Sequence, residues 1–145
     1  MLKNKELKVL QELRNNSRAR LTEISKRTGI PVSTIHDKLK SRYEGIITKM
    51  TCLVDFRQLG YTARAFVTLK VEKKDRDALR EYLEKNPSVN NIFKINNGYD
   101  FMIEGVFKYL QDLEEFSEIL DERFSIKEKQ VYYIIADVKR EVALC

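Results

Sequence analysis

The chain has 145 residues, of which 43% are hydrophobic and 10% aromatic, and it carries 27 Lys and Arg against 22 Asp and Glu. This composition supports one ordinary domain or two small ones with a packed core, and it excludes a disordered chain. No apolar run approaches the roughly 20 residues of a membrane span, and the N-terminus lacks an apolar signal core, so we expect a cytoplasmic protein. Cys52 and Cys145 have no metal-ligand or disulfide-scaffold spacing, and no cofactor is expected.

The positive charge is concentrated at the N-terminal end. Residues 1–50 hold 12 Lys and Arg against 5 Asp and Glu, a net charge of +7, whereas residues 51–145 hold 15 against 17, a net charge of −2. Phosphate binding rewards local Lys and Arg through counterion release, so this asymmetry favours a DNA-binding head on a neutral or acidic body. A Lys-rich surface that is merely exposed to solvent would carry the same charges. The asymmetry supports DNA binding only in combination with the sequence motif described next, which lies within the same residues.

The basic region is predicted to form three helices. The first covers residues 4–15, where apolar side chains recur at helical spacing. Helices over residues 21–27 and 31–42 follow, with a tight turn between them. Gly29 can take the positive φ of such a turn, and Pro31 suits the start of a helix. Two short helices joined in this way are typical of a helix-turn-helix DNA-binding motif.

The polar side chains of the last predicted helix are candidate DNA contacts, because this helix enters the major groove in such motifs. They are Ser33, Thr34, His36, Asp37, Lys38, Lys40 and Arg42. Residues near the start of the preceding helix are candidate phosphate contacts, since a helix N-terminus adds N–H donors. They are Arg18, Arg20 and Thr22. Ser33, Asp37 and Lys40 share one face, so the whole set cannot point one way. His36 is the only histidine, and no metal site or catalytic triad is expected around it.

The rest of the chain predicts a second unit after a connector. Residues 46–55 are β-branched and partly alternating, and we expect a wing or a linking strand there. Strands are then predicted at 63–71, 89–95, 101–107 and 131–135, and helices at 75–85 and 108–123. The order β-α-β-β-α-β is that of a ferredoxin-like fold, with an antiparallel sheet and both helices on one face. The other face needs cover, and a partner subunit is the simplest one.

The predicted fold class is therefore α+β, with a three-helix winged helix-turn-helix domain and a C-terminal ferredoxin-like βαββαβ domain. We expect the DNA-binding domain at residues 1–50, a linking strand and hinge at 51–62, and the second domain at 63–145. Within the second domain, the Asn97-Gly98 pair favours a tight hairpin.

This order of elements resembles the Lrp/AsnC, or feast/famine, family of transcription regulators. The resemblance covers essentially the whole chain and rests on the segments 7–13, 21–30, 33–39 and 97–101. It implies dimers formed by the second domains, assembly of dimers into tetramers or octamers, and binding of a small effector, often an amino acid, between subunits. The effector residues that it marks lie at the turn after residue 95. They are Asn97, Gly98, Tyr99 and Asp100.

The chemistry of this turn is compatible with such an effector, because free N–H groups and a carboxylate can hold both ends of a zwitterion. A hairpin with aromatic anchors explains the same residues without a ligand. The chain departs from the family between Leu39 and Gly45, where it is one residue shorter and Tyr43 replaces the usual Leu. We expect this short exit to alter the angle between head and body.

The leading hypothesis is a sequence-specific regulator that binds double-stranded DNA, dimerises and senses a small molecule. A chromosome-architectural protein is one alternative, because basic heads on an oligomeric body also coat DNA. An RNA-binding module is another, since a βαββαβ domain with aromatic residues on a central strand describes an RNA-recognition fold. The sequence contains no nucleotide loop, nucleophile-base pair or metal cluster, and we expect no enzyme.

Overall fold

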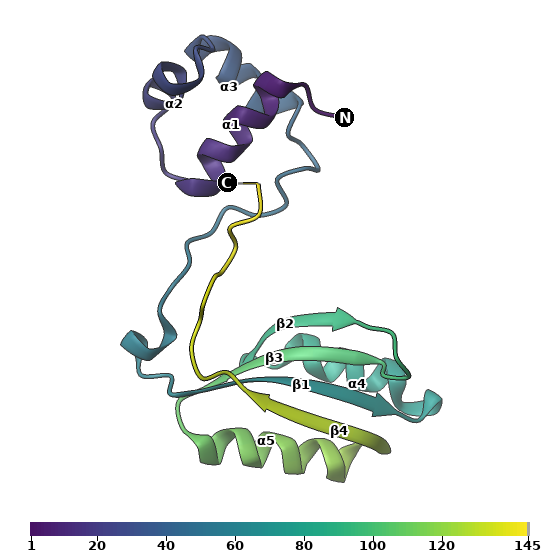
Figure 1. The fold of residues 1–145 in the computed structure, drawn as a ribbon. Helices are drawn as coiled ribbons and strands as arrows, with labels where there is room; N and C mark the ends of the chain where they lie inside the picture. Colours follow the sequence, from purple (N-terminus) through teal and green to yellow (C-terminus); the bar gives the residue numbers. More distant parts are fainter. Residues whose placement is uncertain (145) are drawn as a thin grey trace. The chain divides into compact units, whose positions relative to one another are not determined.

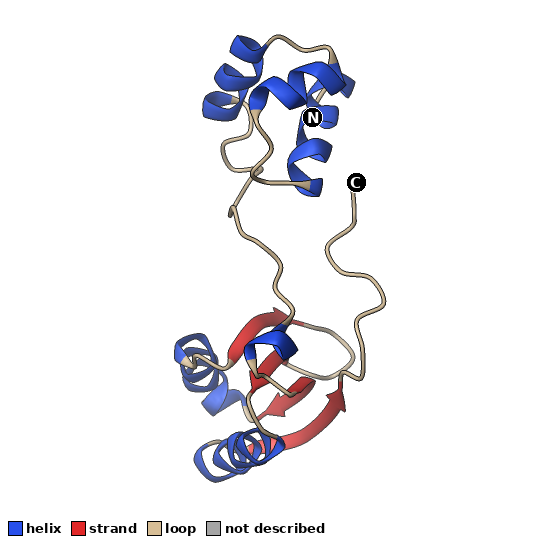
Figure 2. Ribbon diagram, turned by 90° about the vertical axis from the view of Figure 1, so that its left-hand side faces the viewer, coloured by secondary structure: helices blue, strands red, loops and turns tan. Residues whose placement is uncertain are grey.

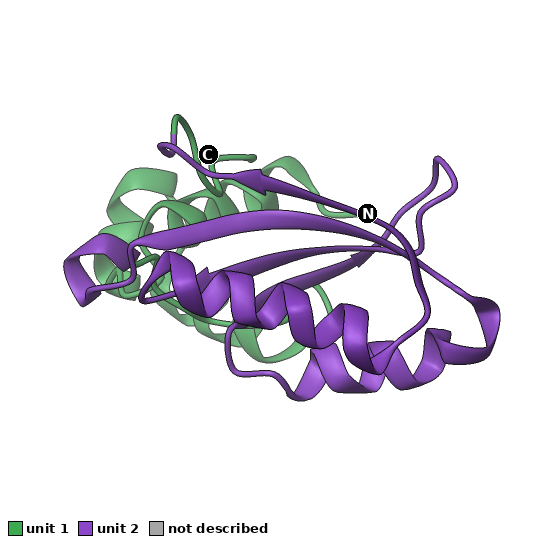
Figure 3. Ribbon diagram, turned by 90° about the horizontal axis from the view of Figure 1, so that it is seen from below, with its two compact units in different colours: residues 1–54, 138–145 green, residues 55–137 purple. Residues whose placement is uncertain are grey.

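The computed structural model describes residues 1–144, which form two compact units (Figure 3). The first, called the head below, holds residues 1–54 and the C-terminal segment from Val138. The second, called the body, holds Asp55–Asp137. The functional division predicted at 1–50, 51–62 and 63–145 stays a prediction. Cys52 is an exposed free thiol, and Cys145 lies outside the described residues.

Three helices build the head: α1 (Asn4–Asn15), α2 (Leu21–Thr28) and α3 (Val32–Ser41) (Figure 1). The first has the predicted bounds, and the other two differ from the predicted bounds by one residue at their ends. Gly29 ends α2 with φ 73°, and its amide donates to the carbonyl of Ser25. The prediction that this glycine supplies the left-handed turn is confirmed. The buried core takes side chains from all three helices and from the residues after them. They are Val9, Leu10, Leu13, Ile24, Ile30, Ile35 and Tyr43.

The expected strand at residues 46–55 is not formed within residues 1–144. The backbone there is turn and irregular, and Phe56–Leu59 follows as a short 3-10 helix. A β-branched run becomes a strand only when another backbone pairs with it, and the four strands of the described chain pair with one another. The C-terminal segment returns to the head instead, where the Nε of Arg14 donates to the carbonyl of Ala143 at 3.2 Å.

The body contains the predicted βαββαβ order. Its elements are β1 (Ala63–Val71), a 3-10 turn (Lys73–Asp75), α4 (Arg76–Lys85), β2 (Val89–Lys94), β3 (Phe101–Phe107), α5 (Leu110–Arg123) and β4 (Ile126–Tyr133). The strands pair antiparallel in the order β2-β3-β1-β4. Figure 2 shows both helices on the same side of the strands. The predicted α+β class and ferredoxin-like fold are confirmed.

Alternation along β1 separates the two faces of the sheet. Every second residue from Ala63 to Val71 is buried, and these side chains pack against Leu79 of α4 and Phe116 of α5. The residues between them lie on the opposite face, which neither α4 nor α5 of the body covers, and which is called the open face below. No helix of the described residues is long and apolar enough to cross a membrane.

Candidate DNA interface and candidate effector turn

The helix α3 is anchored by Ile35, which is fully buried in the core of the head. Its opposite side carries Ser33, Asp37 and Lys40, all exposed, and this set is called the outward face below. The structure thus brings together the three residues that the sequence places on one face. The carboxylate of Asp37 lies 3.7 Å from the Nδ1 of His36, and its side chain is 83% exposed. These side chains are free to meet a groove.

Two of the other candidates, Lys38 on α3 and Arg42 directly after it, form ion pairs within the head. The Nζ of Lys38 lies 2.7 Å from the Oε1 of Glu6, and the Nε of Arg42 lies 3.5 Å from its Oε2. Arg42 also donates to the carbonyl of Met1 at 2.9 Å. Thr34 is half-buried on the same side of the helix. The cations that α3 directs toward α1 therefore bind a carboxylate of the head.

Glu6 is a buried charge that the sequence interpretation did not identify. Its residue is 4% exposed, and the amide of Lys3 donates to its Oε2 at 2.8 Å. The hydrogen bond from Lys38 and the one from the Lys3 amide lower the pKa of this carboxyl to about 2. The sequence feature that could have revealed this burial is the helical spacing of Glu6, which falls in the same stripe as Val9, Leu10 and Leu13.

The candidate phosphate contacts lie around the start of α2. Arg18, Arg20 and Thr22 are all exposed, and Arg20 immediately precedes the first turn of the helix. Within residues 1–144 no ion pair engages either arginine, so their charges are available to a polyanion. His36 belongs to no group of three or more candidate metal ligands within the described part of the chain.

The turn between β2 and β3 adopts the tight geometry that the sequence predicts. Asn97 and Gly98 have φ values of 63° and 79°, the signs that a two-residue hairpin turn requires. Tyr99 is half-buried, and burial together with the nearby carboxylate of Glu128 raises the pKa of its hydroxyl. The four effector candidates thus lie at one end of the sheet.

Asp100 points into the body rather than into the turn. Its Oδ2 accepts the amide of Val71 at 2.9 Å, and its Oδ1 lies 3.0 Å from the Nε of Arg76. The side chain is 14% exposed. This carboxylate therefore ties the end of β1 to the start of α4, and an effector that binds it has to share it with these two groups.

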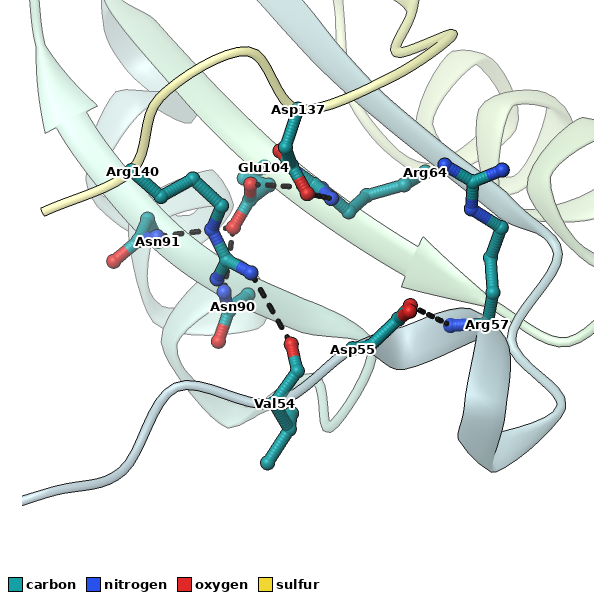
Figure 4. A network of polar contacts seen from close by, with 9 residues as sticks. All are labelled: Val54, Asp55, Arg57, Arg64, Asn90, Asn91, Glu104, Asp137 and Arg140. Atoms are coloured by element: carbon teal, nitrogen blue, oxygen red, sulfur yellow. Dashed lines mark hydrogen bonds and ion pairs between the residues drawn. The ribbon is translucent and has the colours of Figure 1, made fainter.

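The open face of the sheet carries a polar network around Glu104 (Figure 4). The carboxylate of Glu104, 5% exposed as a residue, accepts from Arg64 at 3.2 Å and from Asn91 at 3.0 Å. The guanidinium of Arg64 also binds Asp137, and this hydrogen bond raises its pKa. The sequence interpretation missed this network, although Glu104 interrupts an otherwise apolar strand.

Comparison with known families identifies the class of the chain as that of DNA-binding transcription regulators with a separate ligand-binding domain. A family model described as winged helix-turn-helix DNA-binding matches residues 2–41. A second, described as the Lrp/AsnC ligand binding domain, matches residues 64–144. The chain belongs to the Lrp/AsnC family, as its sequence resemblance implies.

Individual relatives agree with this assignment. The HTH-type transcriptional regulator FL11 of Pyrococcus horikoshii is 32% identical over 114 residues, which are 78% of this chain and 76% of the relative. LrpC of Bacillus subtilis superposes with a TM-score of 0.86 at 19% identity, covering 97% of this chain and 99% of that one. A transcriptional regulator of Neisseria meningitidis, solved in complex with L-Met, gives a TM-score of 0.87 at 21% identity, covering 96% and 93%.

Proposed function

We propose that this regulator reads specific sites on double-stranded DNA through the outward face of α3. The observation that carries the proposal is the orientation of this helix, with Ile35 buried and Ser33, Asp37 and Lys40 exposed on the other side. Hydroxyl, carboxylate and ammonium groups at these positions suit contacts with base edges and phosphates. Arg18, Arg20 and Thr22 then bind the flanking backbone, where phosphate contacts fix the register of the helix.

Selection of bound fragments from random duplex DNA at two salt concentrations tests this function. A consensus sequence whose affinity falls with salt supports a sequence-specific regulator. Even recovery of all sequences contradicts it and favours the architectural alternative. Tight binding of single-stranded RNA, with duplex DNA ignored, favours the RNA-binding alternative. Because the proposed target is chromosomal DNA, we also propose that the protein is located in the cytoplasm, together with the chromosome.

We further propose that a second copy of the chain covers the open face of the body. Four large side chains lie on this face, one from each strand, and they are at least partly exposed: Phe66, Phe93, Met102 and Tyr132. An apolar patch of this kind on a sheet marks an association surface. Sedimentation equilibrium of Phe66→Glu, compared with Lys85→Glu on α4, which lies on the helix-covered side of the sheet with its side chain 75% exposed, tests the assignment. We expect the first variant to be monomeric and the second to associate like the parent chain.

We propose an amino acid as the effector at the turn of residues 97–100. Within residues 1–144 the amides of Asn97 and Gly98 have no hydrogen-bond acceptor, and they suit the carboxylate of such a ligand. The complex of the Neisseria meningitidis relative with L-Met supports this ligand class. Calorimetric titration with the common amino acids checks the proposal. Binding that persists unchanged in Gly98→Pro, which lacks the amide donor of residue 98, would place the effector elsewhere.

A further inference from the structure

Three positive side chains occur on and directly after α3, and they differ in their exposure and in their ion-pair partners. Lys40 is exposed on the outward face and has no ion-pair partner within residues 1–144. Lys38 and Arg42 lie on the side next to α1, where the Glu6 carboxylate binds both of them. Successive residues of a helix point about 100° apart, so Asp37 and Lys38 cannot serve the same surface.

The bond between Lys38 and Glu6 is short and well shielded. The Nζ to Oε1 distance is 2.7 Å, and the exposed fractions of the two side chains are 30% and 6%. A DNA phosphate that takes Lys38 has to leave a buried carboxylate with fewer partners. Removing one partner of a buried charge pair is strongly destabilising, because the remaining charge stays out of water. Replacing the Glu6 carboxylate by a DNA phosphate as the partner of Lys38 therefore adds little to the free energy of DNA binding.

We propose that Glu6 is a positioning residue for DNA binding: it binds Lys38 and Arg42 so that these cations fix α3 in the head and do not neutralise phosphates. This inference rests on the proposed placement of α3 in the DNA groove. Only Lys40 among the three cations then contributes to the salt dependence of binding. Glu6 limits the electrostatic affinity of the head and leaves more of the binding free energy to contacts with the bases.

The salt dependence of affinity separates this role from a merely structural one. Each neutralised phosphate contributes about 0.9 to the slope of log K against log salt concentration. We measure this slope for the full chain and its variants on one selected duplex by fluorescence anisotropy. We expect Lys40→Gln to reduce the slope by about 0.9 per head and Lys38→Gln to leave it unchanged. Glu6→Gln frees two cations, and we expect a slope steeper by roughly 1 to 2 per head.

A matched control removes a carboxylate elsewhere on α1. Glu12 binds Arg27 at 3.0 Å, and Glu12→Gln changes the charge of the head by the same amount as Glu6→Gln. We expect its slope to equal that of the parent chain. A similar increase in both variants would show a general charge effect and overturn the proposal. Thermal unfolding of each variant shows whether it is folded. If Glu6→Gln does not fold, the slopes of Lys38→Gln and Lys40→Gln alone test the proposal.

The remaining outcomes distinguish a failure of the inference about Glu6 from a failure of the proposed function. If Lys38→Gln reduces the slope as much as Lys40→Gln, Lys38 contacts phosphate and the proposal is wrong. The same holds if Glu6→Gln weakens binding with an unchanged slope, because its role is then only structural. If neither lysine variant changes the slope, α3 does not lie against the DNA, and the proposed function fails together with the inference.

Discussion

The hydroxyl of Tyr43 donates a hydrogen bond to the backbone carbonyl of Glu6 at 2.6 Å, across 37 positions of sequence. The Tyr43 residue is 1% exposed, and it follows the last turn of α3. The ring fills the core of the head, while the hydroxyl fixes the exit of α3 to the first turn of α1. The Tyr43 side chain is therefore used both for packing and for a polar contact.

Tyr43→Phe removes only the polar part of this contact. We expect a loss of about 1 kcal/mol in the free energy of unfolding, since a typical intramolecular hydrogen bond contributes that amount. Urea unfolding followed by circular dichroism measures the difference. Tyr109→Phe is the control, because Tyr109 is 65% exposed and its change should be near zero. Equal stability of both variants would mean that the hydroxyl of Tyr43 contributes nothing.

Acid should weaken the head through Glu6. The pKa of this carboxyl is about 2 in the folded chain against an ordinary value of 4.5, so the unfolded chain binds more protons between these values. The stabilisation is complete above the ordinary value and is lost as the pH falls toward 2. We expect unfolding free energies measured from pH 6 to pH 3 to fall less steeply for Glu6→Gln than for the parent chain.

The other lowered carboxyl pKa values, those of Asp75 and Glu81, are shared by both proteins and cancel in this comparison. Glu12→Gln again controls for the loss of one carboxylate from α1. A parent chain and Glu6→Gln variant with parallel pH profiles would contradict the assignment of this acid sensitivity to Glu6.

The elements with a clear local pattern were predictable from the sequence. The strand β1 alternates through its whole length, and α1 has regular apolar spacing, so both have the predicted bounds. The strand β4 instead begins at Ile126, five positions before the prediction, because its first residues are mostly charged or polar. An edge strand tolerates such side chains, and only its pairing with β1 identifies them as strand.

The missed parts of the candidate sites depend on distant partners. Glu6 is buried because Lys38, 32 positions away, approaches it, and Glu104 is buried because Arg64, 40 positions away, does the same. The local pattern places each carboxylate within an apolar stretch but does not identify the cation that pairs with it. Only the packing of α1 against α3, and the register of β3 on β1, brings the cations to them.

Asp37 should act as a base-selective residue. Its carboxylate stands on the outward face of α3, where phosphate repels it and only base-edge donors such as cytosine N4 are suitable partners. We expect Asp37→Asn to bind average duplex DNA more tightly and to lose about 1–3 kcal/mol of discrimination at one base pair. Selection from random duplex DNA measures both effects. Glu44→Gln, at an exposed position outside α3, should keep the parent consensus, and an unchanged consensus for Asp37→Asn would refute this role.

The hairpin turn offers a test of backbone conformation alone. Gly98 has φ 79°, and a Cβ added there meets no atom within 4 Å, so Gly98→Ala is opposed only by its left-handed conformation. We expect a loss of about 1–2 kcal/mol in the unfolding free energy of the body.

Gly105→Ala is the contrasting variant, because its Cβ lies 2.6 Å from the Cε2 of Phe107 and has to displace a core ring. We expect urea unfolding to show a loss for both variants, with the aromatic near-ultraviolet circular dichroism changed only in Gly105→Ala. A changed aromatic spectrum in Gly98→Ala would show that the turn also controls packing in the core.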